Sequence, residues 1–130
     1  MFRENRIMEA GAALFENNPM SVICAAVCNH EAQCAGHCVR GQKGRPVQFY
    51  EIEKFISDLY LDRMALEQEA DNGKRIAVIG SGPAGLTVAI CLARLGYGVT
   101  VFERKDKIGG MLRYGIPEFR LSKKIGRAHV

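Results

Sequence analysis

Hydrophobic residues recur at helical spacing near the start of the chain. One helical face there would carry Ile7, Gly11, Leu14 and Phe15. A repeat of three and four residues predicts an amphipathic helix with one buried side. The helix should end before Asn18 and Pro19, because the residue before a proline disfavours the helical region.

Two further helices are predicted before residue 72. A short helix is expected over residues 20–28, and a longer one begins at Val47. The buried stripe of the longer helix is expected to consist of Ile52, Phe55, Ile56 and Leu59. The loop between these helices is marked by Gly41, Gly44 and Pro46.

The hydrophobic pattern changes after Asn72 and Gly73, which predict a turn. The run RIAVI is typical of a buried parallel strand, and the later run GVTVFE predicts a second strand. A helical segment connects the two. We therefore expect a helical domain over residues 1–72 and the beginning of an α/β domain over residues 73–130, which give an α + α/β fold class.

Three glycines with the spacing G-x-G-x-x-G follow the first predicted strand: Gly80, Gly82 and Gly85. The first would permit a tight turn, the second would let the backbone approach a pyrophosphate, and the third would allow close helix packing. The second strand ends at Glu103, at the chain distance expected of an acid that binds a ribose diol. These features predict a dinucleotide site.

A carboxylate at Glu103 would repel a 2′-phosphate, so FAD and NAD are the two candidates for this site. Gly109 and Gly110 favour FAD, because the chain could return there beside the pyrophosphate without side chains in the way. A plain glycine-rich loop that binds nothing is the alternative interpretation.

Four cysteines lie close together, with the spacing C-x3-C-x5-C-x3-C: Cys24, Cys28, Cys34 and Cys38. This spacing differs from the two-residue gaps of most zinc knuckles and from the ferredoxin pattern. Iron with sulfide, zinc, and structural or disulfide thiols therefore all stay open on spacing alone. His30 and His37 are expected to be hydrogen-bonded or solvated, and Cys91 to be a small apolar residue.

Composition and charge exclude several classes of function. The chain has 130 residues and a formal net charge of +4, without an arginine-rich run or an aromatic series for base stacking, so nucleic-acid binding is not expected. Its start lacks the features of a signal peptide, and no apolar run is long enough for a membrane span. A cytoplasmic location is therefore expected, where clustered cysteines more often hold metal or do redox work than form disulfides.

Four segments together resemble the glutamate synthase small subunit family: NNPMSVICAAVCNHEAQCAGHCVRG, PVQFYEIEKFISD, KRIAVIGSGPAGL and VTVFERKDKIGGMLRYGIPEFRL. The same module is similar to the N-terminal part of dihydropyrimidine dehydrogenase. The resemblance implies a helical iron–sulfur domain followed by an FAD domain with an inserted NAD(P)H domain. It also implies electron transfer from nicotinamide through flavin to 4Fe-4S clusters and on to a catalytic subunit or fused domain.

The resemblance also implies individual site residues. Cys28 and Cys34 with Glu53 would serve one 4Fe-4S cluster, and Cys38 a second, with further cysteines expected from a group upstream of this sequence. Cys24 matches a position that is usually not a ligand. The FAD residues implied are Gly80, Ser81, Gly82, Pro83, Ala84 and Gly85 at the pyrophosphate, Glu103 at the adenosine ribose, and Gly109, Gly110, Met111 and Arg120 alongside the cofactor.

The expected function is therefore that of part of an NAD(P)H-dependent flavin and iron–sulfur oxidoreductase. No catalytic acid or base is identified, and hydride transfer to flavin needs none. One alternative is a non-catalytic metal-binding interaction module joined to a nucleotide-sensing Rossmann segment. Another is an enzyme that binds NAD without flavin.

The chain is expected to be a fragment, because the segment after residue 73 has too few strands for a complete dinucleotide domain. Its last residues, IGRAHV, equal one reading frame of a widely used sequencing adapter. We therefore expect residues 125–130 to be non-native and assign no function to His129.

Overall fold

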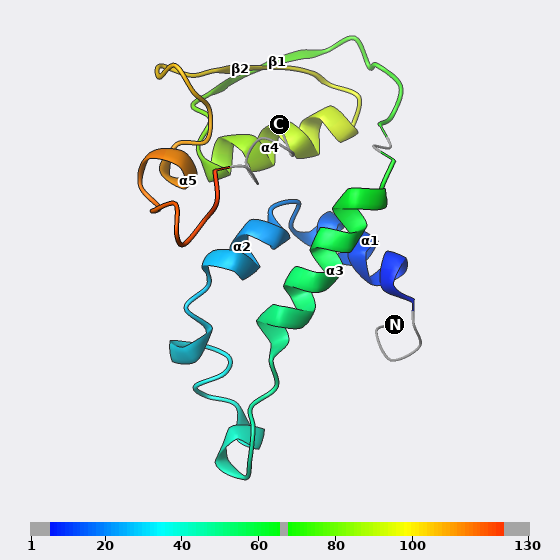
Figure 1. The fold of residues 1–130 in the computed structure, drawn as a ribbon. Helices are drawn as coiled ribbons and strands as arrows, with labels where there is room; N and C mark the ends of the chain where they lie inside the picture. The colour runs from blue at the N-terminus through cyan, green and yellow to red at the C-terminus, as the bar shows by residue number, and fades with distance from the viewer. Residues whose placement is uncertain (1–5, 66–67, 124–130) are drawn as a thin grey trace. The chain divides into compact units, whose positions relative to one another are not determined.

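The computed structural model describes residues 6–65 and 68–123, so the expectation for residues 125–130 lies outside the described residues. The chain divides into two compact units, a helical unit (Met1–Met64) and a sheet unit (Ala65–Val130) (Figure 1). The helical unit contains α1 (Ile7–Asn17), α2 (Ser21–Val27), η2 (His30–Ala32), η3 (Val39–Gln42) and α3 (Phe49–Arg63). The sheet unit contains β1 (Arg75–Ile79), α4 (Pro83–Arg94), β2 (Gly98–Phe102) and α5 (Met111–Tyr114).

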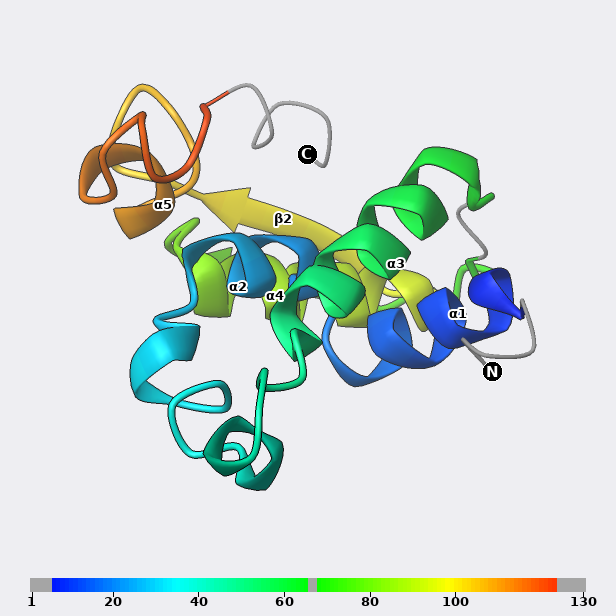
Figure 2. The same cartoon turned by 60° about the horizontal axis from the view of Figure 1, so that its bottom comes forward.

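The core of the helical unit forms where α1 and α2 both pack against α3 (Figure 2). Its buried apolar side chains are Phe15, Met20, Val22, Ile23, Ala25 and Ile56. The rings of Phe15 and Tyr60 lie 5.8 Å apart between centroids, and a Cβ added to Gly11 would overlap the Tyr60 side chain. The absence of a side chain at Gly11 therefore lets α1 approach α3 closely.

Two serines are buried within this apolar core. Ser21 and Ser57 are only 3% and 2% exposed, and their hydroxyl oxygens lie 2.8 Å apart. Either hydroxyl can donate to the other, so each supplies the partner that a buried polar group requires. This hydrogen bond joins the beginning of α2 to α3.

The three helices predicted for this unit are confirmed, and α1 ends at Asn17 as expected. The predicted buried stripe of α3 is wrong at Phe55, which is 53% exposed, while Ser57 is buried instead. Adjacent helical residues point about 100° apart, so the face centred on Ile56 and Ser57 turns Phe55 towards solvent. The need to contact two helices at once sets this orientation.

The sheet unit is built on a parallel pair of strands connected by a helix. β1 and β2 pair in register from Arg75 with Gly98 to Ile79 with Phe102, and α4 contacts both strands. Figure 1 shows α4 lying along one face of the pair. The observed helical unit followed by a β-α-β unit confirms the predicted α + α/β fold class.

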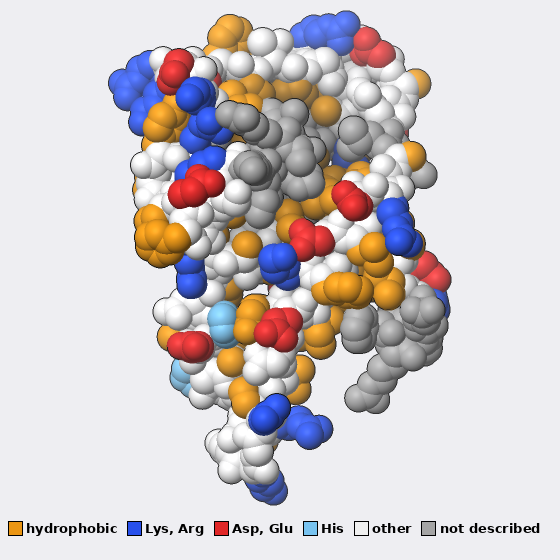
Figure 3. Space-filling model, viewed as in Figure 1, with side chains coloured by type: hydrophobic (Ala, Val, Ile, Leu, Met, Phe, Trp, Pro, Cys, Tyr) orange, Lys and Arg blue, Asp and Glu red, His pale blue; other side chains and the backbone are white. Residues whose placement is uncertain are grey.

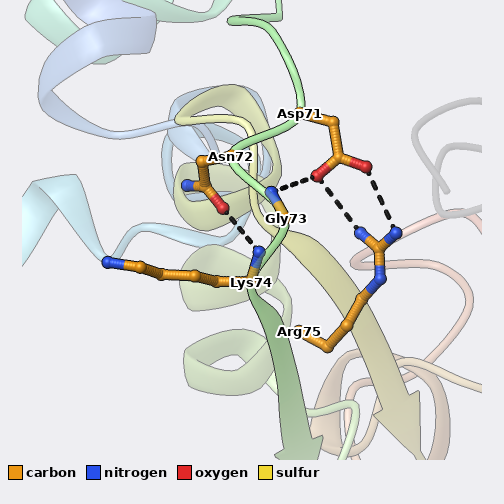
Figure 4. A network of polar contacts seen from close by, with 5 residues as sticks. All are labelled: Asp71, Asn72, Gly73, Lys74 and Arg75. Carbon is orange, nitrogen blue, oxygen red and sulfur yellow. Dashed lines mark hydrogen bonds and ion pairs between the residues drawn. The ribbon is translucent and has the colours of Figure 1, made fainter.

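Polar side chains shape the turn that leads into β1 (Figure 4). Oδ1 of Asp71 accepts a hydrogen bond from the N–H of Gly73 at 2.8 Å, and Oδ1 of Asn72 accepts one from the N–H of Lys74 at 3.0 Å. The guanidinium of Arg75 donates to both carboxylate oxygens of Asp71, at 3.3 and 3.2 Å. Side-chain acceptors two residues before the donor are typical of turns, and the predicted turn is confirmed.

One face of the two-stranded sheet is open in the described part of the chain. Ile79 is 82% exposed and Phe102 is 54% exposed, because α4 covers the opposite face. RIAVI forms the expected strand, but the burial expected of it is wrong for this face. Among residues 6–65 and 68–123, every helix is too short or too polar to cross a lipid bilayer.

The buried serine pair generates a stability prediction. Replacing Ser57 with Ala leaves the Ser21 hydroxyl buried without its partner, which should lower the free energy of unfolding by about 1–3 kcal/mol. The double variant Ser21→Ala with Ser57→Ala should lose less free energy of unfolding than the two single variants lose in sum, because no hydroxyl is then left buried without a partner. Urea unfolding followed by helical circular dichroism checks this; additive losses would show that the hydroxyls act independently.

Candidate functional site

The candidate dinucleotide site begins where the two parallel strands end. Ile79 pairs with Phe102, so Gly80 and Glu103 follow at the same edge of the sheet. The N–H of Gly80 donates to the carbonyl oxygen of Phe102 at 2.7 Å, and Gly80 has a φ of +95°. This φ lies in the left-handed region that favours glycine, and it turns the chain out of β1 towards α4.

The start of α4 lies directly after this turn. Pro83 occupies the first helical position after Gly82, as expected of a residue that needs no hydrogen-bond partner for its nitrogen. A Cβ on Gly85 would overlap the carbonyl oxygen of Gly80, whereas a Cβ on Gly82 would meet no atom within 4 Å. Gly85 therefore permits close packing, and the space beside Gly82 is open.

The carboxylate of Glu103 is held by the glycine-rich turn. Its Oε2 accepts hydrogen bonds from the Ser81 hydroxyl and from the N–H of Ser81, the latter at 2.9 Å. Its Oε1 accepts one from the N–H of Lys105 at 2.9 Å. The Ser81 hydroxyl is the largest cause that lowers the pKa of Glu103 to about 2, followed by the backbone N–H donors. The carboxylate is therefore charged at neutral pH.

A second glycine turn packs against the first. The N–H of Gly109 donates to the carbonyl oxygen of Ser81 at 3.0 Å and to its hydroxyl oxygen at 3.1 Å. Gly110 has a φ of +51°, and a Cβ there would lie 2.7 Å from Cα of Gly82. The chain thus returns to the glycine-rich turn at the two glycines singled out in the sequence.

The remaining predicted FAD residues Ala84, Met111 and Arg120 are all exposed. Ala84 is exposed in the first turn of α4. Met111, which begins α5, is 66% exposed, and Arg120 is also exposed. The residues present fit a dinucleotide, because they offer open space beside Gly82, a charged carboxylate and the N–H groups of a helix start.

The cysteine segment, residues 24–38, is α-helical only at its start. Cys24 lies in α2, where the Asn18 amide donates to its sulfur at 3.4 Å, but Cys28 ends the helix with extended backbone angles. Cys34 is exposed, and Cys38 precedes η3. The short helix expected over residues 20–28 therefore ends before Cys28, because α2 ends at Val27. All five cysteines are outside disulfide bonds, and Cys91 is half-buried in α4.

Backbone donors surround the sulfur of Cys38. N–H groups of Val47, Arg40 and Gly41 lower the pKa of its thiol, with Val47 the largest cause. A lowered thiol pKa favours the thiolate, which is the form that ligates metals. Figure 3 shows Lys and Arg side chains gathered at the η3 end of the helical unit, next to this segment. Burial raises the pKa of the proposed ligand Glu53 on α3.

The predicted cluster ligands lie in separate elements, with Cys28 at the end of α2, Cys38 before η3 and Glu53 in α3. Among the described residues, no group of three or more His, Cys, Asp or Glu side chains is arranged to hold a metal ion. Further cysteine ligands are expected from upstream of this sequence, so the ligation of 4Fe-4S clusters by Cys28, Cys34, Cys38 and Glu53 stays a prediction. The two histidines of this segment are hydrogen-bonded as expected: His30 Nδ1 lies 3.3 Å from the Cys28 carbonyl oxygen, and His37 Nδ1 lies 3.0 Å from that of Gln33.

Comparison with protein families separates the same two segments. Residues 1–65 match the family described as dihydropyrimidine dehydrogenase domain II, 4Fe-4S cluster. The chain belongs to this family. Residues 78–122 match the NAD(P)-binding Rossmann-like domain, in agreement with the β-α-β arrangement and its glycine-rich turn.

Curated relatives confirm that this chain resembles glutamate synthase small subunits. The chain is 40% identical over 127 residues to the glutamate synthase (NADPH) small chain of Mycobacterium tuberculosis. It is 36% identical over 125 residues to that of Escherichia coli. It is also 36% identical over 119 residues to an NAD-dependent dihydropyrimidine dehydrogenase subunit PreT homolog of Salmonella typhi.

These alignments cover most of this chain and a minor part of each relative. They include 95%, 94% and 89% of the chain, but 26%, 26% and 29% of the respective relatives. The chain thus spans less than a third of the length of these curated relatives.

The sequence interpretation missed two sets of hydrogen bonds. It placed Ser81 at the pyrophosphate without noticing that its side chain would join Glu103 to Gly109. It also missed the N–H donors to the Cys38 sulfur. The signal that could have indicated them is Gly41, three residues after Cys38, because a glycine at this spacing is typical of a tight turn.

The contact between the two glycine turns can be tested by adding a methyl group. Gly110→Ala should lower the stability of the sheet unit by at least about 1 kcal/mol, because it forces a side chain into a left-handed φ and against Gly82. Gly82→Ala is the matched control and should change stability little, since its Cβ meets open space at a φ of −68°. Hydrogen exchange of the β1 and β2 amides measures this unit alone; equal protection in both variants would contradict the packing.

Proposed function

We propose that the chain is part of a cytoplasmic NAD(P)H-dependent oxidoreductase that contains FAD and 4Fe-4S clusters and resembles the glutamate synthase small subunit. The observation that carries the proposal is the juxtaposition of Gly82, the charged carboxylate of Glu103 and the Gly109–Gly110 turn at one sheet edge. The family match of residues 1–65 supports the iron–sulfur part.

In this proposal each FAD residue has a role that follows from its position. Gly80 turns the chain, Gly82 leaves room for the pyrophosphate, and Gly85 packs α4 against the strand turn. Pro83 and Ala84 begin α4, whose first N–H groups and positive dipole end face the phosphates. FAD, when bound, supplies the conversion between hydride transfer and single-electron transfer.

The acid at the end of β2 provides the second part of the FAD site. Glu103 accepts hydrogen bonds from the adenosine ribose diol, and its charge disfavours a 2′-phosphate. Gly109, Gly110 and Met111 line the returning chain beside the cofactor, and Arg120 contributes positive charge nearby. These roles are carried over from the resemblance, and the proximity of the two glycine turns supports them.

For the helical unit, we propose that Cys28 and Cys34 with Glu53 serve one cluster and that Cys38 serves a second. The N–H donors around Cys38 support the last assignment, since they stabilise a thiolate. The remaining ligands belong to the longer protein, as does the NAD(P)H domain. The proposed domains are residues 1–72 for the iron–sulfur part and residues 73–130 for the beginning of the FAD part.

The proposed partner is a catalytic subunit or fused domain that receives the electrons. The names of two relatives support such a partner, because the Escherichia coli relative is named a small chain and the Salmonella typhi relative is named a subunit homolog. Neither nucleic acid nor a membrane is part of the proposal.

Direct binding of FAD tests the proposed function. The chain refolded with FAD should retain yellow absorbance, and Glu103→Ala should weaken FAD binding by roughly tenfold or more, because a charged hydrogen-bond acceptor is lost. Glu69→Ala is the control, since this exposed carboxyl lies in the same unit beside Arg94 at the end of α4, whereas Glu103 follows the end of β2. Isothermal titration measures both affinities.

Other outcomes would support the competing functions. A colourless chain that binds NAD would favour an enzyme without flavin. Zinc without iron or acid-labile sulfide in the protein purified without oxygen would favour the metal-binding interaction module. Equal FAD affinity in the wild type and Glu103→Ala would show that Glu103 is not the ribose acid.

A further inference from the structure

Ser81 has the most completely buried side chain of the described residues. Its exposed fraction is 0%, although it lies in the glycine-rich turn between Gly80 and Gly82. A pyrophosphate in the space beside Gly82 would meet backbone atoms there, because the Ser81 hydroxyl is turned inward to protein groups. The Ser81 side chain therefore has a role other than direct contact with a ligand.

The hydrogen bonds of Ser81 connect three separate segments. Its hydroxyl donates to Oε2 of Glu103 and accepts from the N–H of Gly109 at 3.1 Å. Its backbone N–H donates to the same carboxylate oxygen at 2.9 Å, and its carbonyl oxygen accepts from Gly109 at 3.0 Å. A hydroxyl has one proton to donate, so donation to Glu103 leaves its lone pairs for Gly109.

We propose that Ser81 is a positioning residue that holds Glu103 and the Gly109–Gly110 turn in place for the dinucleotide through its buried hydroxyl. The identity of the ligand as FAD rests on the proposed function, whereas the hydrogen-bonded arrangement does not. Because hydrogen bonds within the protein join the three segments, less ordering accompanies binding than if each had to be brought into place.

The same hydroxyl lowers the pKa of the acid. The groups that face the Glu103 carboxylate are the Ser81 hydroxyl and the N–H groups of Ser81, Lys105 and Arg104, with burial opposing their effect. The Ser81 hydroxyl is the largest cause that lowers the pKa to about 2, so its removal should raise the pKa towards the ordinary value of 4.5. Stability linked to this carboxylate is present above the ordinary value and is lost as pH falls through the lowered one.

The decisive measurement is the ionisation of Glu103 in the 130-residue chain, followed by carbon-13 NMR of labelled glutamate carboxyls. In the wild type, the Glu103 signal should keep its charged position down to about pH 4, where an ordinary glutamate is largely protonated. In Ser81→Ala the titration of this signal should shift to higher pH than in the wild type, and Ser81→Thr, which keeps the hydroxyl, should restore the wild-type titration. Ser57→Ala removes an equally buried hydroxyl in the other unit and should leave the signal unchanged.

Affinity for FAD provides the second readout. Ser81→Ala should bind FAD roughly tenfold more weakly at neutral pH, with a larger deficit in mild acid, while Ser57→Ala matches the wild type. An unchanged Glu103 signal and affinity in Ser81→Ala would overturn the proposal. If Ser81→Ala does not fold, the titration of Glu103 in the wild type still tests the inference. An ordinary pKa for Glu103 in the wild type would overturn it. Failure of the wild type to bind FAD would instead contradict the proposed function and leave the NMR result decisive for Ser81.

Discussion

Parallel pairing of β1 with β2 is the constraint on which the sheet unit depends. Parallel strands need a crossover connection, which α4 provides, and their carboxyl ends then meet at one edge. In the observed register, Gly80 and Glu103 are the first residues beyond the paired segment. Gly80 and Glu103 are distant in sequence, and the pairing of the strands makes them neighbours without a direct bond between them. The hydrogen bonds of Ser81 then join the two strand ends.

Features governed by local periodicity and by backbone sterics could be predicted from the sequence. The three helices of the first unit follow from hydrophobic spacing, and the end of α1 follows from Pro19. The glycine turn was predictable for two reasons. Few residue types tolerate the positive φ of Gly80, and a side chain at position 85 would overlap the carbonyl oxygen of Gly80. The sheet edge that carries Glu103 follows from these elements and the rule for parallel strands.

Features that depend on tertiary contacts could not be predicted in the same way. The exposure of Phe55 depends on how α3 meets two partner helices, and one helical step separates it from buried Ile56. The short helix predicted to include Cys28 ends one residue earlier, at Val27. The hydrogen bonds of the Ser81 hydroxyl could not be predicted, because its direction depends on the glycines beside it and on Gly109, 28 residues later.

The open sheet face has a consequence for the behaviour of the chain during expression and storage. Ile79 and Phe102 present apolar side chains next to each other at the end of the strand pair, uncovered in the described residues. Exposed apolar strands with unpaired edges are templates for β-pairing between molecules and for recognition by chaperones. The shelf life of the isolated polypeptide should therefore be governed by its concentration more than by the temperature at which its core melts.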